Sequence, residues 1–405
     1  MAGRGAGGTR PAWSVDESGL SLRHAERACL GLHGAWGSVS IGGEALSLAD
    51  ARMEPRRRSR SRDGRPVVEV PFVWPGRELR WTWRIEEADG ALRIAAELAN
   101  TGPSPVRVGE WHVLDLDRAR GGVLDLGEEP ANVRFFGWRP WDMRVERLAG
   151  EEGAHGSNNL LHLYDAADGT ALLCGFVTLD RMLVRHDLDC GPGGGVRRCR
   201  ATCRFGDYGL PPGEEMVSET LHVAYHDDPY AALESWADAV RRIYAPAFEP
   251  VPPVIYSGTT WLHVWSGQEG PWETVLLEGA RAVKEKLAGF RVDCLSGTTH
   301  HAYRDGIPGN WYEFNEEQFP GGLEVTLEKL WAMGFAHKFW FFAEAHGVLE
   351  ENRENLLRDA SGEPIAEPAT WEWDTHGDAD DSPRLTKYYL DGTHPKTQDY
   401  VRRIF

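Results

Sequence analysis

The 405-residue sequence has little basic charge, few cysteines and no long apolar run. It carries 44 lysine and arginine residues against 62 aspartate and glutamate residues, a formal net charge of -18. This balance argues against nucleic acid as a partner, because phosphates need a basic surface. No stretch approaches the roughly 18 apolar residues of a spanning helix, so no membrane partner is expected.

Cysteine and histidine are too scattered to form a metal-binding signature. The six cysteines are Cys29, Cys174, Cys190, Cys199, Cys203 and Cys294. Cys199 and Cys203 are four residues apart, which on a strand places them on one face, so packing explains them better than zinc. His300 and His301 are adjacent and have no partner cluster. We predict free thiols, no metal and no cofactor.

Three local features have simple structural interpretations. Residues 1–13, MAGRGAGGTRPAW, lack the apolar core of a secretory signal, so a cytoplasmic location is predicted. The arginine-rich run 56–62 lies between strand-like segments and is interpreted as a solvated hairpin loop. The glycine cluster 191–195 lacks the lysine and following helix of a phosphate cradle, so it is interpreted as a turn.

The first half of the chain has the alternation of antiparallel strands. With 41% hydrophobic and 26% charged residues, the chain can form two or more globular units. Apolar residues alternate with polar ones in 79–85, and the same alternation occurs in 92–98. Asp89-Gly90 lies between the two segments, so the pattern predicts a hairpin. Similar short runs continue to about Tyr225. Residues 1–226 are therefore predicted to form a large antiparallel β-sandwich.

A helix and a proline-rich connector follow the predicted sandwich. Asp228 and Pro229 are start signals for a helix, and after Tyr244 the chain reads APAFEPVPPV. Residues 227–253 are predicted to link the sandwich to a second domain at 254–405.

The second domain begins with repeated strand and helix units. A strand from Val254 to His263 is followed by a helix, 273–287, that ends at Gly289. A short strand, Phe290–Val292, then places Asp293 at its exit.

A second such unit follows. Pro320 opens a helix whose apolar face is predicted to contain Leu323, Leu327, Leu330 and Trp331, and Gly334 ends it. The apolar run 335–342 predicts a buried parallel strand with Glu344 just past its carboxyl end, where barrel enzymes place their chemistry.

A fourth strand, 387–390, is predicted to end at Asp391 before a helix that runs to Phe405. About 150 residues follow the connector, whereas a (β/α)8 barrel needs about 200 or more. The barrel is therefore expected to be incomplete in this chain.

Five segments resemble glycoside hydrolase family 36, the melibiase-type α-galactosidases and raffinose synthases. They are WYEFNEEQFPGGL at 311–323, WFFAE at 340–344, YYLDGTHP at 388–395, FFGWRPWDMRVERL at 135–148 and DDPYAALESWADAV at 227–240. The resemblance implies a β-supersandwich followed by a TIM-type (β/α)8 barrel. It also implies hydrolysis of terminal α-linked galactosyl residues by a retaining mechanism with two carboxylates.

Both family carboxylates that react are expected beyond Phe405, so these 405 residues alone are expected to be inactive. The resemblance implies a sugar or oligosaccharide as partner and a possible homo-oligomer. Two alternatives stay open, which are galactosyl transfer as in raffinose synthases and a non-catalytic carbohydrate-binding or scaffold protein.

Trp340 and Glu344 match a Trp-x-x-x-Glu pattern that binds substrate in the resembled family. An indole plane can stack on the apolar face of a pyranose, and a carboxylate can accept hydrogen bonds from its hydroxyls. The alternatives are core packing for Trp340 and, for Glu344, an ion pair with Lys338 or Arg353.

Asp293 matches only one of the family's paired aspartates, because Val292 stands beside it and Leu295 replaces the usual tryptophan. Galactose specificity therefore stays open. A carboxylate after a buried strand is costly unless a substrate or a basic group satisfies it, so Asp293 is predicted to bind substrate.

Four further residues complete the candidate site. Trp261 and Trp265 either face the sugar or are buried. Arg384 lies one residue from the position of a family arginine that binds substrate. Asp391 is predicted to be structural, hydrogen-bonded to the turn before the last helix.

Overall fold

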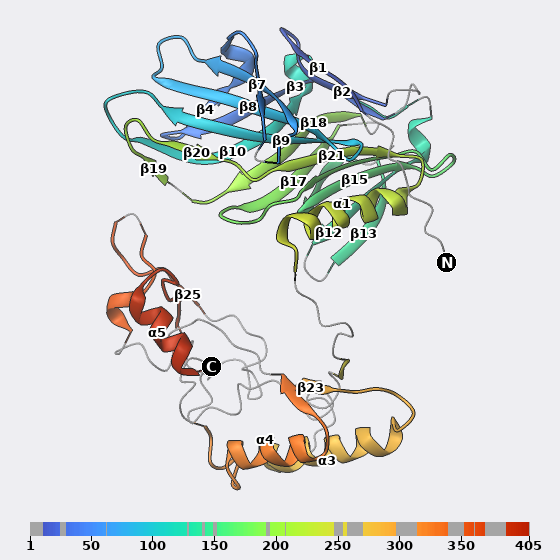
Figure 1. Ribbon diagram of the computed structural model, residues 1–405, viewed down its shortest axis with the longest axis vertical. Helices are drawn as coiled ribbons and strands as arrows, with labels where there is room; N and C mark the ends of the chain where they lie inside the picture. Colours follow the sequence, from blue (N-terminus) through green and yellow to red (C-terminus); the bar gives the residue numbers. More distant parts are fainter. Residues whose placement is uncertain are drawn as a thin grey trace. The chain divides into compact units, whose positions relative to one another are not determined.

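The computed structural model describes residues 11–24, 30–61, 63–127, 129–139, 142–148, 152–191, 195–206, 208–246, 254–256, 270–296, 314–338, 352–359, 361–368 and 386–404. The chain divides into two compact units, Met1–Pro246 and Ala247–Phe405 (Figure 1). The boundaries predicted from sequence, 1–226, 227–253 and 254–405, stay a prediction.

The first unit contains two large antiparallel sheets. Within the described residues, the ten-stranded sheet has the order β1-β2-β3-β10-β18-β17-β14, with β4 and β11 on β3 and β19 on β10. Its strands are β1 (Ala12–Asp16), β2 (Gly19–Arg23), β3 (Gly31–Ile41), β4 (Glu44–Ser47), β10 (Val106–Asp117), β11 (Val123–Asp125), β14 (Gly153–Asn158), β17 (Leu183–Cys190), β18 (Val196–Arg204) and β19 (Tyr208–Leu210).

The second sheet of this unit has eleven strands in the described residues and the order β13-β12-β15-β16-β21-β9-β8-β7-β5, with β6 on β7 and β20 on β9. Its strands are β5 (Arg52–Met53), β6 (Arg57–Arg60), β7 (Pro66–Val73), β8 (Leu79–Ala88), β9 (Ala91–Asn100), β12 (Val133–Arg139), β13 (Asp142–Arg147), β15 (Leu160–Asp165), β16 (Ala171–Phe176), β20 (Glu215–Val217) and β21 (Leu221–His226).

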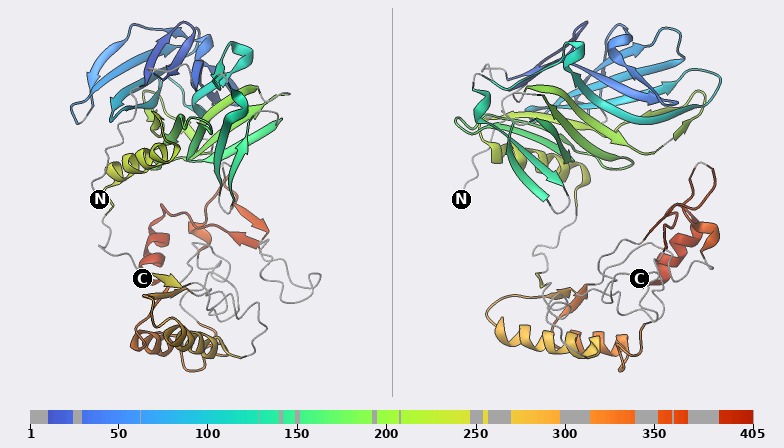
Figure 2. Two further views of the ribbon diagram at one scale, coloured as in Figure 1. Left: turned by 90° about the vertical axis from the view of Figure 1, so that its right-hand side faces the viewer. Right: turned by 180° about the vertical axis from the view of Figure 1, so that it is seen from behind.

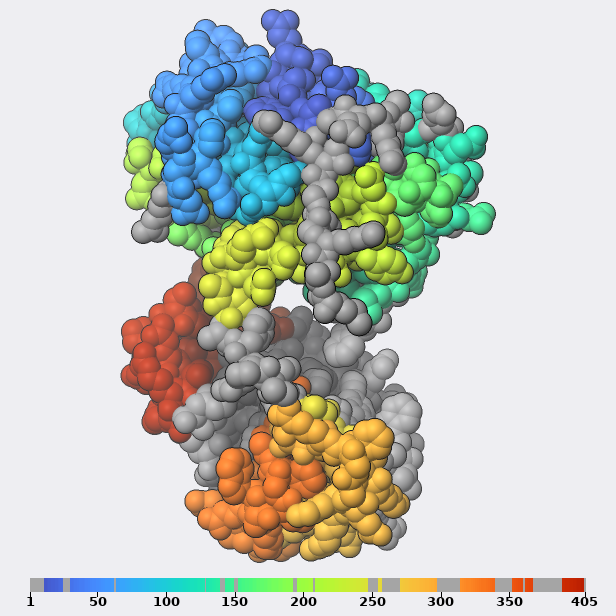
Figure 3. Space-filling view, turned by 45° about the vertical axis from the view of Figure 1, so that its right-hand side comes forward, coloured from blue at the N-terminus to red at the C-terminus, as the bar shows by residue number. Residues whose placement is uncertain are grey.

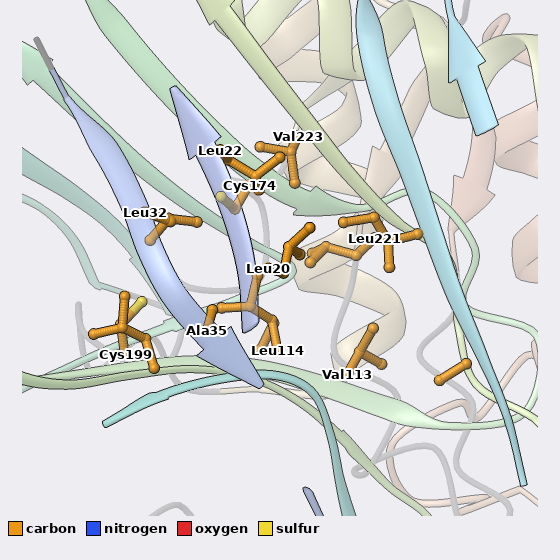
Figure 4. Close-up of a cluster of buried hydrophobic side chains, with 14 of the residues drawn as sticks. Leu20, Leu22, Leu32, Ala35, Val113, Leu114, Cys174, Cys199, Leu221 and Val223 are labelled. Atoms are coloured by element: carbon orange, nitrogen blue, oxygen red, sulfur yellow. The ribbon is translucent and has the colours of Figure 1, made fainter. Parts of the chain in front are cut away.

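The core of the first unit lies between the two sheets. One continuous cluster of buried side chains joins them, with Leu20, Leu114, Cys174 and Val223 among its members in Figure 4. Cys199 and Cys203 are buried in this cluster, as the packing interpretation predicts. Apolar burial stabilises by roughly 25 cal/mol per Å², so this cluster is the dominant stabilising feature of the unit. The predicted β-sandwich is confirmed.

The predicted hairpin across Asp89-Gly90 is confirmed. Strands β8 and β9 pair antiparallel from Leu79↔Asn100 to Ala88↔Ala91. Asp89 and Gly90 have φ values of 54° and 79°, as a two-residue turn with left-handed backbone requires.

Helix α1 (Pro229–Tyr244) packs on the outer face of the eleven-stranded sheet, against β16 and β21 (Figure 2). Asp228 caps it by accepting hydrogen bonds from the backbone N–H groups of Tyr230 and Ala231. The indole Nε1 of Trp236 donates to the carbonyl of Phe176 at 2.9 Å. Gly175 makes this contact possible, because a Cβ there would lie 2.6 Å from the Trp236 ring. Figure 3 shows the other side of α1 at the surface.

The arginine-rich run is part of the eleven-stranded sheet. Arg57–Arg60 forms strand β6, which pairs with β7, so the predicted hairpin loop is corrected to a strand. The three arginines are exposed and Ser59 is partly buried, which is compatible with an edge strand, where positive charge discourages pairing with other chains.

One part of the second unit is a small parallel sheet with two helices packed on it. Strands β22 (Ile255–Tyr256), β23 (Cys294–Ser296) and β24 (Ala336–Lys338) pair in parallel. Helices α3 (Trp272–Lys286) and α4 (Leu323–Ala332) pack against each other and form a core with Leu295. The strand and helix units are therefore present, but a (β/α)8 barrel is not shown by the described residues and stays a prediction.

Two predictions for helix α4 and for the predicted fourth strand of this unit are wrong. Trp331 is 74% exposed and lies outside the apolar face of α4, whose buried residues are Thr326 and Leu330. The predicted fourth parallel strand is β26 (Thr386–Tyr388), which pairs antiparallel with β25 (Ala366–Pro368). The helix after it, α5 (Pro395–Ile404), is confirmed.

Among the described residues, the structure has no helix with the length and apolar character needed to cross a bilayer.

Candidate functional site

The carboxyl ends of the three parallel strands form the best candidate site in the second unit. Cys294 and Ser296 of β23 are in register with Ala336 and Lys338 of β24. Because side chains alternate along a strand, these four residues lie on the sheet face opposite Leu295, which packs on the helices. Ser296 and Lys338 end their strands, so a hydroxyl and an ammonium group lie on one face at this edge. We call Tyr256, Ser296 and Lys338 the rim.

The rim has polar groups with distinct roles. Ser296 is 5% exposed, whereas Lys338 is exposed. A hydroxyl both donates and accepts, and an ammonium group donates three hydrogen bonds, so the pair suits a polyhydroxylated neutral ligand. Burial raises the pKa of the Cys294 thiol and lowers the pKa of His337 to about 4. Both groups are therefore neutral at pH 7, so neither adds charge to the sheet beside the rim.

Sequence patterns did not identify Ser296 or Lys338 as site residues. The signal that could have found them is the register of parallel strands, because residues that end neighbouring strands share one edge. That register depends on strand bounds, which apolar runs alone define poorly.

Most of the predicted sugar-binding residues follow the rim along the chain but lie outside the described residues. The chain continues from Tyr256, Ser296 and Lys338 into residues 257–269, 297–313 and 339–351. The predicted residues in these segments, and one further along the chain, are Trp261, Trp265, Trp340, Glu344 and Arg384. Their roles stay predictions.

Asp293 lies at the opposite end of its strand from the one predicted. The strand is Cys294–Ser296 instead of Phe290–Val292, so Asp293 precedes it. Phe290 is 75% exposed, and its N–H donates to the carbonyl of Leu287 in the turn after α3. The short apolar run therefore begins in this turn, and the buried strand begins four residues later.

Asp293 uses its carboxylate to hold the amino ends of β22 and β23 together. One oxygen accepts a hydrogen bond from the N–H of Val254 at 2.8 Å, and the Arg291 guanidinium pairs with the same carboxylate at 2.8 Å. The Val254 N–H, and then Arg291, lower the pKa of Asp293. In barrel folds this end of the sheet serves stability, whereas chemistry occurs at the carboxyl end. The placement on which the sugar-binding prediction depended is therefore not observed.

We expect Asp293→Asn to lower the melting temperature of the protein and to leave unchanged the sugar binding that the sequence predicts. The pKa of Asp293 is lowered in the fold, so its stabilising effect is present above the ordinary value of 3.8 and is lost as the pH falls through the folded value. Thermal unfolding at pH 7 and calorimetric titration with galactose measure the two effects. Weaker sugar binding with an unchanged melting temperature would restore Asp293 to the binding site.

Asp391 bonds to the turn before α5. Its Oδ1 accepts hydrogen bonds from the backbone N–H and the hydroxyl of Thr393, at 2.9 and 2.6 Å. These contacts, the hydroxyl first, lower the pKa of Asp391. The sequence analysis predicted that Asp391 hydrogen-bonds to this turn, and the structure has these bonds.

No group of three or more potential metal ligands occurs in the part of the chain that the structure describes. A cavity of about 330 Å³ lies on the first unit beside Arg118, Asp125 and Pro130. The residues that line it all belong to the first unit, and none of them is a predicted sugar-binding residue.

Comparison with solved structures identifies the fold. The chain is similar to GH36 α-galactosidase AgaB from Geobacillus stearothermophilus, with 11% identity, a TM-score of 0.57 and coverage of 91% of this chain and 52% of that chain. A variant of α-galactosidase AgaA from the same organism, in complex with raffinose, is similar at 11% identity with a TM-score of 0.58. The match covers 91% of this chain and 52% of that chain. The α-N-acetylgalactosaminidase NagBb from Bifidobacterium bifidum, in complex with GalNAc, is similar at 12% identity with a TM-score of 0.61. The match covers 96% of this chain and 65% of that chain.

The chain therefore has a fold shared with glycoside hydrolases, and it spans about half the length of the α-galactosidases that it matches. No family profile and no curated protein sequence matches it. The sequence resemblance to family 36 and the shared fold agree, while identities of 11–12% show the fold and not the family.

Proposed function

We propose that this chain is part of a retaining glycoside hydrolase that removes terminal α-linked galactosyl or related hexosyl residues. The observation that carries the proposal is the fold, which extends over 91% of the chain in common with an α-galactosidase bound to raffinose. Its support in this chain is the rim, where three parallel strands end and where the predicted tryptophan and glutamate segments begin.

In this proposal the rim and the segments after it hold the sugar, while a pair of carboxylates elsewhere in the whole protein performs the reaction. One carboxylate attacks the anomeric carbon and the other protonates the leaving oxygen, so the two lie about 5–5.5 Å apart. Trp340 stacks on the apolar face of the ring and Glu344 accepts hydrogen bonds from its hydroxyls. Lys338 and Ser296 orient the sugar from the ends of their strands. No cofactor is needed for such a displacement.

A second candidate is a protein that binds carbohydrate without cleaving it. Galactosyl transfer to another sugar is a variant of the first proposal, because it uses the same covalent intermediate. The predicted cytoplasmic location stays a prediction.

Activity assays separate these functions. We expect the whole protein to hydrolyse p-nitrophenyl α-galactoside or its N-acetylgalactosamine analogue, and the 405-residue chain to bind galactose without turnover. Product analysis with sucrose present would distinguish transfer from hydrolysis. Binding without turnover by the whole protein would support the carbohydrate-binding alternative, and turnover by the 405-residue chain would show that the reacting carboxylates lie within it.

A matched pair of variants tests the role of the rim segments. In the whole protein we expect Trp340→Ala to lower kcat/KM by about tenfold or more, because an aromatic contact with the ring is lost. Trp331→Ala is the control, since Trp331 is 74% exposed on α4. Equal effects of the two substitutions would argue against a sugar-binding Trp340.

A further inference from the structure

Helix α1 packs on one strip of strand β16 in the first unit (Figure 1). Ala171 and Leu173 share a buried cluster with Ala232 of the helix, and a Cβ at Gly175 would lie 2.6 Å from the Trp236 ring. Alternate residues of a strand point to the same face of a sheet. These three β16 residues therefore form the strip that α1 covers.

A histidine lies directly opposite each residue of this strip. His162 of β15 is in register with the middle residue, and His222 and His226 of β21 are in register with the two end residues. Side chains directly opposite each other lie on one face of an antiparallel pair. The three imidazoles therefore flank the strip on the face that α1 covers, and their residues are 2%, 2% and 5% exposed.

Two of these imidazoles are buried without a hydrogen bond. Neither ring nitrogen of His162 or of His222 has a hydrogen-bond partner in the part of the chain that the structure describes. An imidazolium ion has two N–H donors and a charge, and burying them unpaired costs far more than burying the neutral ring. Burial lowers the pKa of His162 to about 4 and that of His222 to about 3. Both rings are therefore neutral at pH 7 while α1 covers them.

The charges around His222 add to this cost. Arg93 of β9 is its cross-strand neighbour and, after burial, lowers its pKa most. His226 and, on α1, Arg242 lower it further. Asp89 raises it, but this carboxylate already pairs with Arg93 at 3.5 Å and with Arg242 at 3.4 Å. A proton on His222 would therefore add positive charge beside two guanidinium groups that share one carboxylate.

Fewer charges surround the other two histidines. The Tyr164 ring stacks on His162 with ring centroids 5.5 Å apart, and after burial the charge of His226 lowers the pKa of His162 further. Burial also lowers the pKa of His226, while the carboxylates of Asp227 and Asp228 raise it. These carboxylates offset part of the effect of burial at His226, so protonation is most unfavourable at His162 and His222.

We propose that His162 and His222 form an acid-sensitive switch, which keeps α1 packed on the sheet at neutral pH and releases it in acid. When α1 leaves, both rings reach water and titrate near the ordinary pKa of 6.5. The packed state then binds fewer protons than the released state, so its stability is full above pH 6.5 and falls as the pH drops towards the folded values. Helix α1 is the last element of the first unit, so its release adds 16 residues to the chain between the units. The proposal is independent of the proposed hydrolase activity.

Hydrogen exchange of the 405-residue chain measures the release. Mass spectrometry follows the backbone amides of α1 at pH 7 and pH 5, and the rates are expressed as protection factors, which removes the chemical effect of pH on exchange. Each histidine that returns to its ordinary pKa favours release by about 20-fold between these pH values, so the two together should lower the protection of α1 by about 400-fold. Strand β10 of the other sheet should keep its protection. An α1 that loses no more protection than β10 would overturn the proposal.

Neutral substitutions test the two histidines. We expect His162→Gln and His222→Gln each to remove about 20-fold of the pH dependence, and the double variant to remove nearly all of it, because glutamine takes up no proton. His112→Gln is the matched control, since burial also lowers the pKa of His112 but this residue lies on β10. It should leave the pH dependence of α1 unchanged. A dependence that survives both single substitutions, or that His112→Gln removes equally, would show that another group drives the release.

Discussion

Replacing Trp81 with alanine is expected to lower the free energy of unfolding of the sandwich by about 3–5 kcal/mol. Trp81 is fully buried between the two sheets, with its ring centroid 5.3 Å from that of Trp111 and 6.4 Å from that of Trp74. The backbone at Gly37 leaves room for the ring, since a Cβ there would lie 2.5 Å from it. A domain is stable by only about 5–15 kcal/mol, so this loss is large. Urea denaturation followed by circular dichroism measures it.

Two controls separate the cavity from other effects of the substitution. Trp81→Phe should cost less, because it keeps an aromatic ring and removes an indole N–H that is buried with no hydrogen-bond partner in the described structure. Trp331→Ala, on the exposed side of α4, should change stability little. A small effect of Trp81→Ala would show that the two sheets do not depend on this packing.

Replacing Glu273 with alanine is expected to lower the stability of the second unit by about 2 kcal/mol. Glu273 is 7% exposed near the start of α3. Its carboxylate accepts a hydrogen bond from the N–H of Gly321 at 2.6 Å and one from Nζ of Lys329 at 2.9 Å. Gly322, the capping residue of α4, offers no side chain, so Glu273 places negative charge beside the amino end of that helix. Thermal unfolding compares the variant with the wild-type chain.

The same carboxylate predicts a dependence on pH. Lys329, and then the N–H of Gly321, lower the pKa of Glu273 from its ordinary value of 4.5. Its stabilising effect is therefore present above pH 4.5 and is lost as the pH falls through the folded pKa, so the difference between wild type and variant should shrink in acid. Glu328→Ala, at an exposed position on α4, is the matched control. Equal losses of stability for Glu273→Ala and Glu328→Ala would contradict the proposed role of Glu273 at the amino end of α4.

Local patterns predicted the elements of the first unit well. Alternating apolar residues on both sides of Asp89-Gly90 predicted the β8–β9 hairpin, because two left-handed residues there permit a two-residue turn. Asp228 and Pro229 predicted the start of α1 for a similarly local reason, a side chain that reaches the first free N–H groups.

The second unit was harder, because a three-residue strand has too little sequence to define its own ends. Phe290 and Val292 have the composition of a strand, yet the sheet takes Cys294–Ser296. The shift moves Asp293 from the exit of the strand to its entrance. In the same way, Thr386–Tyr388 has strand composition but pairs antiparallel with β25, and nothing local distinguishes an antiparallel partner from a parallel one.

The sequence by itself determined the division into a strand-rich part and a part with alternating strands and helices, the main hairpin, the start of α1 and the resemblance to sugar hydrolases. These follow from side-chain period, turn chemistry and motifs, which act over a few residues. Only the tertiary structure decided which sheet each strand joins, which end of β23 holds Asp293, and that Ser296 and Lys338 share a rim. Strand partners are chosen by burial and register between distant segments, and no local pattern encodes that choice.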